Sequence, residues 1–161
     1  MNIGEWIAKR AWLYPGRPFL KEDGQELDNA RFNARVNRTA HGLLDLGLAK
    51  GDRVVVLMAN ASAFLEVFFA CAKTGALVVP VNTHLAAEEL VHVVGDAAPR
   101  VLIYSADMEA NVGKIKLDLG TGIRYLVHGQ AASGDPTLEA LTRDRWRMSL
   151  PQAMMWISPI P

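Results

Sequence analysis

Short apolar runs alternate with helical patterns along this chain, and the clearest example lies within residues 51–90. Residues 53–58 and 76–81 are rich in Val, which is typical of parallel strands covered on both faces. Between these runs, apolar side chains recur at the spacing of one helix face: Ala63, Phe64, Val67, Phe68, Cys71 and Ala72. The pattern predicts a β-α-β unit with a right-handed connection.

Residues at the two ends of this helical pattern are suited to begin and end a helix. The Ser62 hydroxyl is predicted to cap the first turn, because a serine side chain readily accepts a hydrogen bond from a free backbone N–H group. Gly75 is predicted to end the helix in the left-handed conformation, which costs glycine little. The helix should therefore lie between these two residues.

The residues before the central unit predict a helix, a hairpin and a second helix. Asn2 is predicted to cap the first helix, whose apolar side consists of Ile3, Trp6, Ile7 and Leu13. The pair Asp23-Gly24 favours the positive φ angles of a tight turn and so predicts a small antiparallel hairpin. Asp28 is predicted to cap the second helix, which runs to about residue 46 and ends at Gly47.

The rest of the chain continues the alternation. It predicts, in order, helix 87–94, strand 101–104, helix 108–119, strand 123–127, loop 129–136 and a helical turn at 138–141. The predicted strands start every 22 to 25 residues, which favours a parallel sheet with helices on both faces. The expected fold class is α/β, with layered β-α-β units plus the N-terminal hairpin, and residues 1–161 are expected to form one partial domain.

Composition and charge narrow the class of protein. The 161 residues carry 17 basic and 17 acidic side chains, so no net field attracts nucleic acid and no nucleic-acid partner is expected. No uncharged stretch provides the roughly 20 apolar residues that a membrane span needs, and no signal-peptide pattern is visible. Cys71, the only cysteine, falls on an apolar helix face, where we expect buried filler. A soluble, cytoplasmic protein is therefore expected.

Several short motifs keep the spacing of a known superfamily. They are Gly51-Asp52-Arg53-Val54, Asn60, Gly75-Ala76, Pro80-Val81-Asn82 and Glu88-Glu89-Leu90. With these motifs the chain resembles the N-terminal region of the adenylate-forming, AMP-binding enzymes, in particular fatty acyl-CoA ligases, over residues 3–103. Ala59 stands where the family usually has Pro, and His84 where Arg is common, but neither disrupts the β-α-β unit.

The resemblance implies ATP, Mg²⁺ and CoA as cofactors and a carboxylic acid as substrate. Members of the family form an acyl adenylate from the acid and ATP, and then transfer the acyl group to CoA. Their ATP phosphates bind to the backbone N–H groups and hydroxyls of a Ser, Thr and Gly loop. Trp156 and Ser158 resemble the start of that loop, whereas Pro159 stands in the place of its first Gly. Because proline has no N–H group and a fixed φ, a working phosphate loop is not expected.

The chain retains few candidates for ligand binding. Asn82, Thr83 and His84 follow a predicted strand at its carboxyl end, where open α/β sheets place ligands, and the resemblance implies that this neighbourhood lines the CoA entrance. The alternative is that Asn82 only ties a turn and His84 is a solvated loop residue. Ser158 is expected to be a remnant of the phosphate loop. We expect no catalytic residue and no metal site, and no tight binding of ATP, Mg²⁺ or CoA to this chain.

The resemblance thus implies the N-terminal part of an acid–thiol ligase for fatty or related acids, without the phosphate loop and C-terminal domain and inactive alone. An aryl-CoA ligase or an amino-acid adenylation fragment is the alternative enzyme. A non-catalytic module that self-associates or pairs with a ligase remainder, or an inert product of a disrupted coding sequence, remains open. The apolar residues 154–157 are typical of a buried strand, so a ligase-like coding sequence is expected downstream of Pro161.

Overall fold

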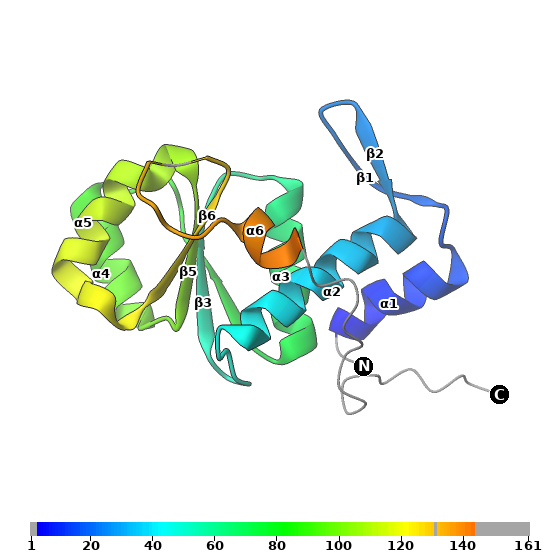
Figure 1. The fold of residues 1–161 in the computed structure, drawn as a ribbon, viewed down its shortest axis with the longest axis horizontal. Coiled ribbons are helices and arrows are strands. Elements are labelled where there is room, and N and C mark those ends of the chain that lie inside the picture. Colours follow the sequence, from blue (N-terminus) through cyan, green and yellow to red (C-terminus); the bar gives the residue numbers. More distant parts are fainter. Residues whose placement is uncertain (1–2, 131, 144–161) are drawn as a thin grey trace.

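A four-stranded parallel sheet forms the centre of the computed structural model, which describes residues 3–130 and 132–143 (Figure 1). Strands β3 (Arg53–Leu57), β4 (Leu77–Pro80), β5 (Val101–Ser105) and β6 (Arg124–His128) lie in the order β4-β3-β5-β6. All neighbouring strands in this sheet run parallel. The predicted α/β class and parallel sheet are therefore confirmed.

Helices cover both faces of this sheet, as the alternation predicted. On one face lie α1 (Ile3–Leu13), α2 (Asn29–Asp45) and α3 (Ser62–Thr74), which pack against Val54, Val56 and Ile103. On the other face lie α4 (Ala87–Ala97) and α5 (Glu109–Leu119), which pack against Val55, Leu57, Leu102 and Tyr104. Alternate residues of β3 and β5 thus serve two separate cores, because successive side chains of a strand point to opposite faces. Figure 1 shows these two helical layers on either side of the strands.

Strand β4 differs from the expectation that it would be covered on both faces. It is an edge strand, in which Leu77 is 54% exposed and Pro80 is exposed as well. Proline has no N–H group for a further strand to accept, so it is found mainly at sheet edges. The prediction of two-sided burial holds for β3, whose residues after Arg53 are all buried, and is wrong for β4.

The N-terminal hairpin and the start of α2 follow the local signals closely. Strands β1 (Pro18–Glu22) and β2 (Gln25–Asp28) pair antiparallel, and Asp23 and Gly24 both have positive φ, at 48° and 77°. The Arg31 N–H group donates to Asp28 Oδ1 at 2.7 Å, so Asp28 caps α2. The predicted hairpin and cap are confirmed.

Helix α1 is buried on a narrower face than its apolar pattern predicted. Gly4 and Ile7 are buried, whereas Ile3 and Leu13 are exposed. Trp6 lies at the margin, where its ring stacks on Phe69 of α3 with centroids 6.1 Å apart. The predicted cap Asn2 lies outside the described residues.

The remaining elements are short helical segments before and after β6 and after β5. Two 3₁₀ turns, η1 (Ala106–Met108) and η2 (Gly120–Gly122), flank α5, and α6 (Leu138–Arg143) follows the loop after β6. Cys71 is fully buried in α3, and burial raises the pKa of its thiol to about 12, so the prediction of buried filler is confirmed. Within residues 3–130 and 132–143, no helix combines the length and the apolar character that a membrane crossing requires.

Candidate functional site

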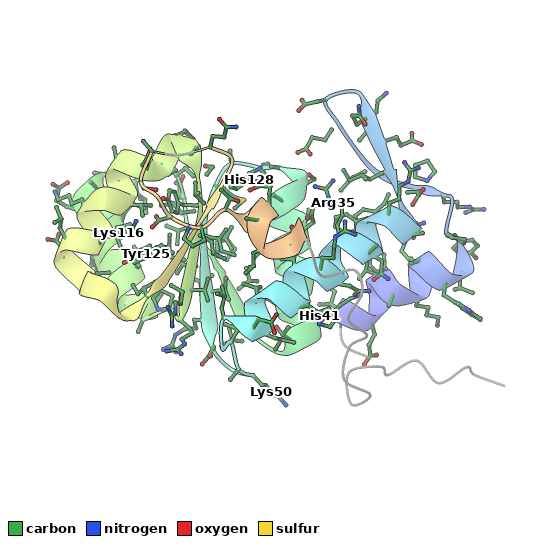
Figure 2. The ribbon with its side chains drawn as sticks, viewed as in Figure 1. Arg35, His41, Lys50, Lys116, Tyr125 and His128 are labelled. Atoms are coloured by element: carbon green, nitrogen blue, oxygen red, sulfur yellow. The ribbon has the colours of Figure 1, made fainter. Side chains whose placement is uncertain are left out.

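The carboxyl ends of the four strands meet along one edge of the sheet, and a polar pocket opens there. All four strands of this sheet are parallel, so the segments that follow β3, β4, β5 and β6 gather at this edge, where α/β proteins usually bind ligands. The pocket lies among α2, α3, β6 and α6 and is lined by Arg35, Arg38, Ala63, Glu66, His128, Leu138, Glu139 and Thr142. In Figure 2, Arg35 and His128 lie toward this edge, and Lys50 lies at the opposite end of the sheet.

A buried ion pair joins α2 to α3 at the floor of this pocket. One guanidinium nitrogen of Arg35 lies 2.7 Å from Glu66 Oε1, and the Glu66 side chain is only 9% exposed. The contact is an ion pair with poor hydrogen-bond alignment, because Glu66 Oε1 has no well-aligned donor among the described residues. Burial raises the pKa of Glu66, and the positive charges of Arg35 and Arg38 partly oppose that rise.

A second pair connects β6 to α6 at the rim. His128 Nδ1 lies 2.5 Å from Glu139 Oε1, and the Gly129 N–H group donates to the same oxygen at 3.3 Å. These contacts hold the six-residue helix α6 over the end of the sheet. The acidic and basic groups of the pocket are therefore largely paired with one another.

The size and chemistry of the pocket limit what it can bind. Its volume is about 70 Å³, enough for a few water molecules or a small ion but far below the roughly 300–1,000 Å³ of sites that hold drug-sized ligands. No group of three or more His, Cys, Asp or Glu side chains suited to a metal occurs in the described part of the chain. A pocket of this size, as the described residues line it, is too small to enclose ATP or CoA.

A separate network fixes Ser133 and Asp135, which lie between β6 and α6, against the sheet. The Tyr104 hydroxyl donates to Asp135 Oδ2 at 2.6 Å and lies 2.9 Å from Ser133 Oγ, and Lys116 forms an ion pair with Asp135. Burial, followed by the hydrogen bond to Asp135, raises the pKa of Tyr104 to about 12, so the phenol stays protonated as a donor. The Lys116 ammonium also lies 4.9 Å from the centre of the Tyr125 ring (Figure 2). This network serves to position the loop.

The sequence-predicted candidates lie apart from this pocket. Asn82 and His84 are exposed and Thr83 is half-buried, just beyond the carboxyl end of β4. The His84 N–H group donates to Asn82 Oδ1 at 3.0 Å, so Asn82 ties the turn, as the alternative interpretation held. A role of these three residues at a CoA entrance stays a prediction. Ser158 lies outside the described residues.

The prediction that the Ser62 hydroxyl caps the first turn of α3 is wrong. The residue at the cap position is Ala61, with φ −147° and ψ 165°, and Ser62 is the first residue of the helix. The Ser62 N–H group donates to Glu22 Oε1 at 2.7 Å, and its hydroxyl donates to Glu22 Oε2. The hairpin thus supplies the carboxylate that satisfies the start of α3, where the helix dipole also favours a negative charge.

Sequence reasoning missed Glu22, Arg35, Glu66, His128 and Glu139, because their partners are distant along the chain. One usable signal existed for Glu66. It interrupts an otherwise apolar stretch of α3, and a charge in such a place usually has a buried partner.

We expect Glu22→Gln to lower the free energy of unfolding by about 1 kcal/mol at pH 7. The two hydrogen bonds from Ser62 lower the pKa of Glu22 below its ordinary value of 4.5. A lowered pKa in the folded state adds stability that is present above the ordinary pKa and is lost as the pH falls through the folded value. Urea unfolding at pH 7 and at pH 3 should therefore show a difference between the two proteins that shrinks at low pH.

The exposed Glu26 on the neighbouring strand β2 provides the control for this prediction. Glu26→Gln should change stability by about 0.5 kcal/mol or less, since exposed charges contribute little. An equal effect of the two substitutions would show that the carboxylate of Glu22 does not cap α3.

Comparison with known proteins places the fold and the motifs in one family. The AMP-binding enzyme family matches residues 7–153. The chain is 41% identical over 107 residues to the long-chain-fatty-acid–CoA ligase FadD13 of Mycobacterium tuberculosis, covering 65% of this chain and 21% of that protein. It is 36% identical over 114 residues to a feruloyl-CoA synthase of Amycolatopsis sp, covering 71% of this chain and 23% of that protein. The chain thus spans between a fifth and a quarter of the length of these relatives.

Solved structures agree with these matches. The N-terminal domain of FACL13 from Mycobacterium tuberculosis superposes with a TM-score of 0.79 at 33% identity, covering 89% of this chain and 35% of that one. The anthranilate CoA ligase AuaEII superposes with a TM-score of 0.83 over 89% of this chain and 28% of that one, but at 21% identity this likeness concerns the fold alone.

Proposed function

Because the chain belongs to the AMP-binding enzyme family, we propose that it is the N-terminal part of an acid–thiol ligase. The proposed ligase activates a fatty or related carboxylic acid with ATP to an acyl adenylate and transfers the acyl group to CoA. The observation that carries the proposal is the family match over residues 7–153, supported by the identity to FadD13. The name of the second relative, feruloyl-CoA synthase, supports an aryl-CoA ligase as the second candidate.

We propose that residues 1–161 form one partial domain, which contributes to this reaction through its structure. The pocket at the sheet edge is small and its charged groups are largely paired, so ATP and Mg²⁺ would be held by parts of the ligase beyond the described residues. What this chain contributes is the parallel sheet and its two helical layers, which form a rigid base at whose carboxyl edge the nucleotide-binding remainder would sit. The chain alone is therefore expected to be inactive.

The proposal is tested by supplying the missing part. The full chain is purified alone and after co-expression with the segment of FadD13 that follows the region of similarity. Pyrophosphate exchange into ATP and acyl-CoA formation are measured with palmitate, ferulate and benzoate. We expect no exchange with the chain alone and palmitoyl-CoA formation by the co-expressed pair.

Other outcomes would revise the proposal in specific ways. Faster turnover of ferulate or benzoate than of palmitate would favour the aryl-CoA ligase. A stable but inactive pair would favour the non-catalytic interaction module. Exchange activity of the chain alone would refute the claim that the chemistry needs further residues.

A further inference from the structure

One carboxylate oxygen in the pocket at the sheet edge lacks a hydrogen-bond partner. The Glu66 side chain lines this pocket and is only 9% exposed, yet Glu66 Oε1 receives no aligned hydrogen bond from the described residues. A buried polar atom of this kind is nearly always hydrogen-bonded to protein, to ordered water or to a ligand. Glu66 therefore calls for a donor that occupies the pocket.

Two arginines of α2 bring donors to the same pocket. Arg35 and Arg38 are three residues apart, so they lie on one face of the helix. Arg38 is half-buried, and among residues 3–130 and 132–143 it has no hydrogen-bond or ion-pair partner. A guanidinium has five N–H donors and no acceptor. Arg38 and the remaining N–H groups of Arg35 can therefore bind the oxygen atoms of an anion.

The cations of the pocket surround the Glu66 carboxylate. Burial raises the pKa of Glu66, and the charges of Arg35, His128 and Arg38 all oppose that rise. Figure 2 shows Arg35 and His128, which come to the pocket from α2 and from the end of β6. The second carboxylate of the pocket, Glu139, is already engaged by His128 Nδ1 and the Gly129 N–H group. Arg38 is thus the charge in the pocket that still lacks a counter-charge in direct contact.

These groups define the chemistry of an occupant. It must donate to Glu66 and accept from the arginines, and the two guanidinium groups repel a metal cation. The volume of about 70 Å³ equals the share of roughly two water molecules in the liquid, which suits a small inorganic oxyanion. We propose that this pocket binds a small oxyanion that retains a proton, with hydrogen phosphate as the ligand that fits.

In the proposed complex, the P–OH group of hydrogen phosphate donates to Glu66 Oε1, and its other oxygens accept from Arg35 and Arg38. Sulfate has a similar size and shape but carries no proton near neutral pH, so it would place an acceptor against the Glu66 carboxylate. None of the residues that line the pocket belongs to the motif at 156–159 that resembles the phosphate loop. The site is therefore separate from that motif and does not depend on the proposed function.

The test is calorimetric titration of the full chain with sodium phosphate and with sodium sulfate, near neutral pH and at constant ionic strength. We expect phosphate to bind at least about tenfold more tightly than sulfate, and Arg38→Gln to weaken phosphate binding at least about tenfold. Phosphate should also raise the melting temperature of the unsubstituted chain and not that of Arg38→Gln. The matched control is Arg31→Gln on the same helix, where the side chain is 74% exposed, and it should leave phosphate binding unchanged.

A further variant tests the role of the proton. The amide of Glu66→Gln can donate to any oxyanion, so phosphate and sulfate should bind to this variant with similar affinity. Circular dichroism checks that each variant is folded, and the loss of selectivity in Glu66→Gln carries the test if Arg38→Gln does not fold.

Phosphate binding that Arg38→Gln weakens and Arg31→Gln does not, together with selectivity against sulfate, supports the proposal. Three results would overturn it: no saturable binding of phosphate, equal affinity of the unsubstituted chain for phosphate and sulfate, or equal effects of the two arginine substitutions. None of these results bears on the proposed ligase function, which is tested by acyl-CoA formation.

Discussion

Arg35→Ala is expected to lower the free energy of unfolding by about 2–3 kcal/mol at pH 7. The substitution leaves the buried Glu66 carboxylate without the guanidinium that lies 2.7 Å away. Stranding a buried charge typically costs about 3–5 kcal/mol, and the partial exposure of the Arg35 side chain, at 36%, reduces that range. Guanidinium chloride unfolding followed by circular dichroism measures the loss.

The pH dependence of stability identifies the carboxylate responsible. Burial raises the pKa of Glu66 above its ordinary value of 4.5. A raised pKa in the folded state means that stability is full below the ordinary pKa and decreases as the pH rises through the folded pKa. Removal of Arg35 takes away the charge that opposes the rise, so the variant should lose more stability than the unsubstituted protein between pH 4.5 and neutral pH.

Two further variants separate this effect from a general loss of charge on α2. Arg31 lies one turn earlier, has a side chain that is 74% exposed, and pairs with Asp28 at 3.7 Å, so Arg31→Ala should cost about 0.5 kcal/mol or less. Glu66→Gln added to Arg35→Ala should recover much of the loss, because a neutral amide replaces the stranded carboxylate. Equal losses in Arg31→Ala and Arg35→Ala would show that Glu66 does not depend on its ion pair.

Gly4→Ala is expected to destabilise the protein by about 2–3 kcal/mol, because the added methyl group would force α1 away from α3. A Cβ atom at this position would lie 2.8 Å from the backbone nitrogen of Lys73 and 3.0 Å from the carbonyl carbon of Ala72. Backbone atoms of a packed helix cannot rotate aside as a side chain can. Ile7, which is fully buried one turn later on α1, would lose part of its packing. Thermal unfolding and tryptophan fluorescence measure the change.

Gly113 provides the matched control for this substitution. It lies exposed within α5, and a Cβ atom there would meet nothing within 4 Å. Alanine is favoured over glycine in a helix interior by about 1 kcal/mol, so Gly113→Ala should raise the melting temperature. If Gly4→Ala raised it as well, the close approach of α1 to α3 would be wrong.

Local chemistry determined most of the elements of this fold. The hairpin at Asp23-Gly24, the cap at Asp28 and the left-handed Gly75 each depend on the conformations that a few adjacent residues favour. The regular spacing of apolar runs then predicted a parallel sheet with helices on both faces, because only that arrangement buries short Val-rich strands on two sides. The turn at Asn82 belongs to the same class of local interactions.

The order of strands and the exposure of β4 could not be derived in this way. The runs at β3 and β4 are similarly rich in Val, yet β3 lies between two strands and β4 lies at the edge of the sheet. Which strand ends a sheet depends on the packing of the whole layer, and a short apolar run carries no information about its lateral neighbours. Pro80 was the one local sign of an edge.

The sequence by itself thus determined the order and approximate extent of the helices and strands and which family the motifs resemble. Only the tertiary structure decided which charged groups meet. Glu22 and Ser62 lie 40 residues apart, as do Asn33 and Lys73, and Arg35 meets Glu66 across the same pair of helices. Such pairs form because the packing of apolar faces brings two helices, or a helix and a hairpin, into contact. Polar groups that become buried in this contact then need hydrogen-bond or ion-pair partners from the neighbouring element. The polar pocket and the cap of α3 both follow from that long-range packing.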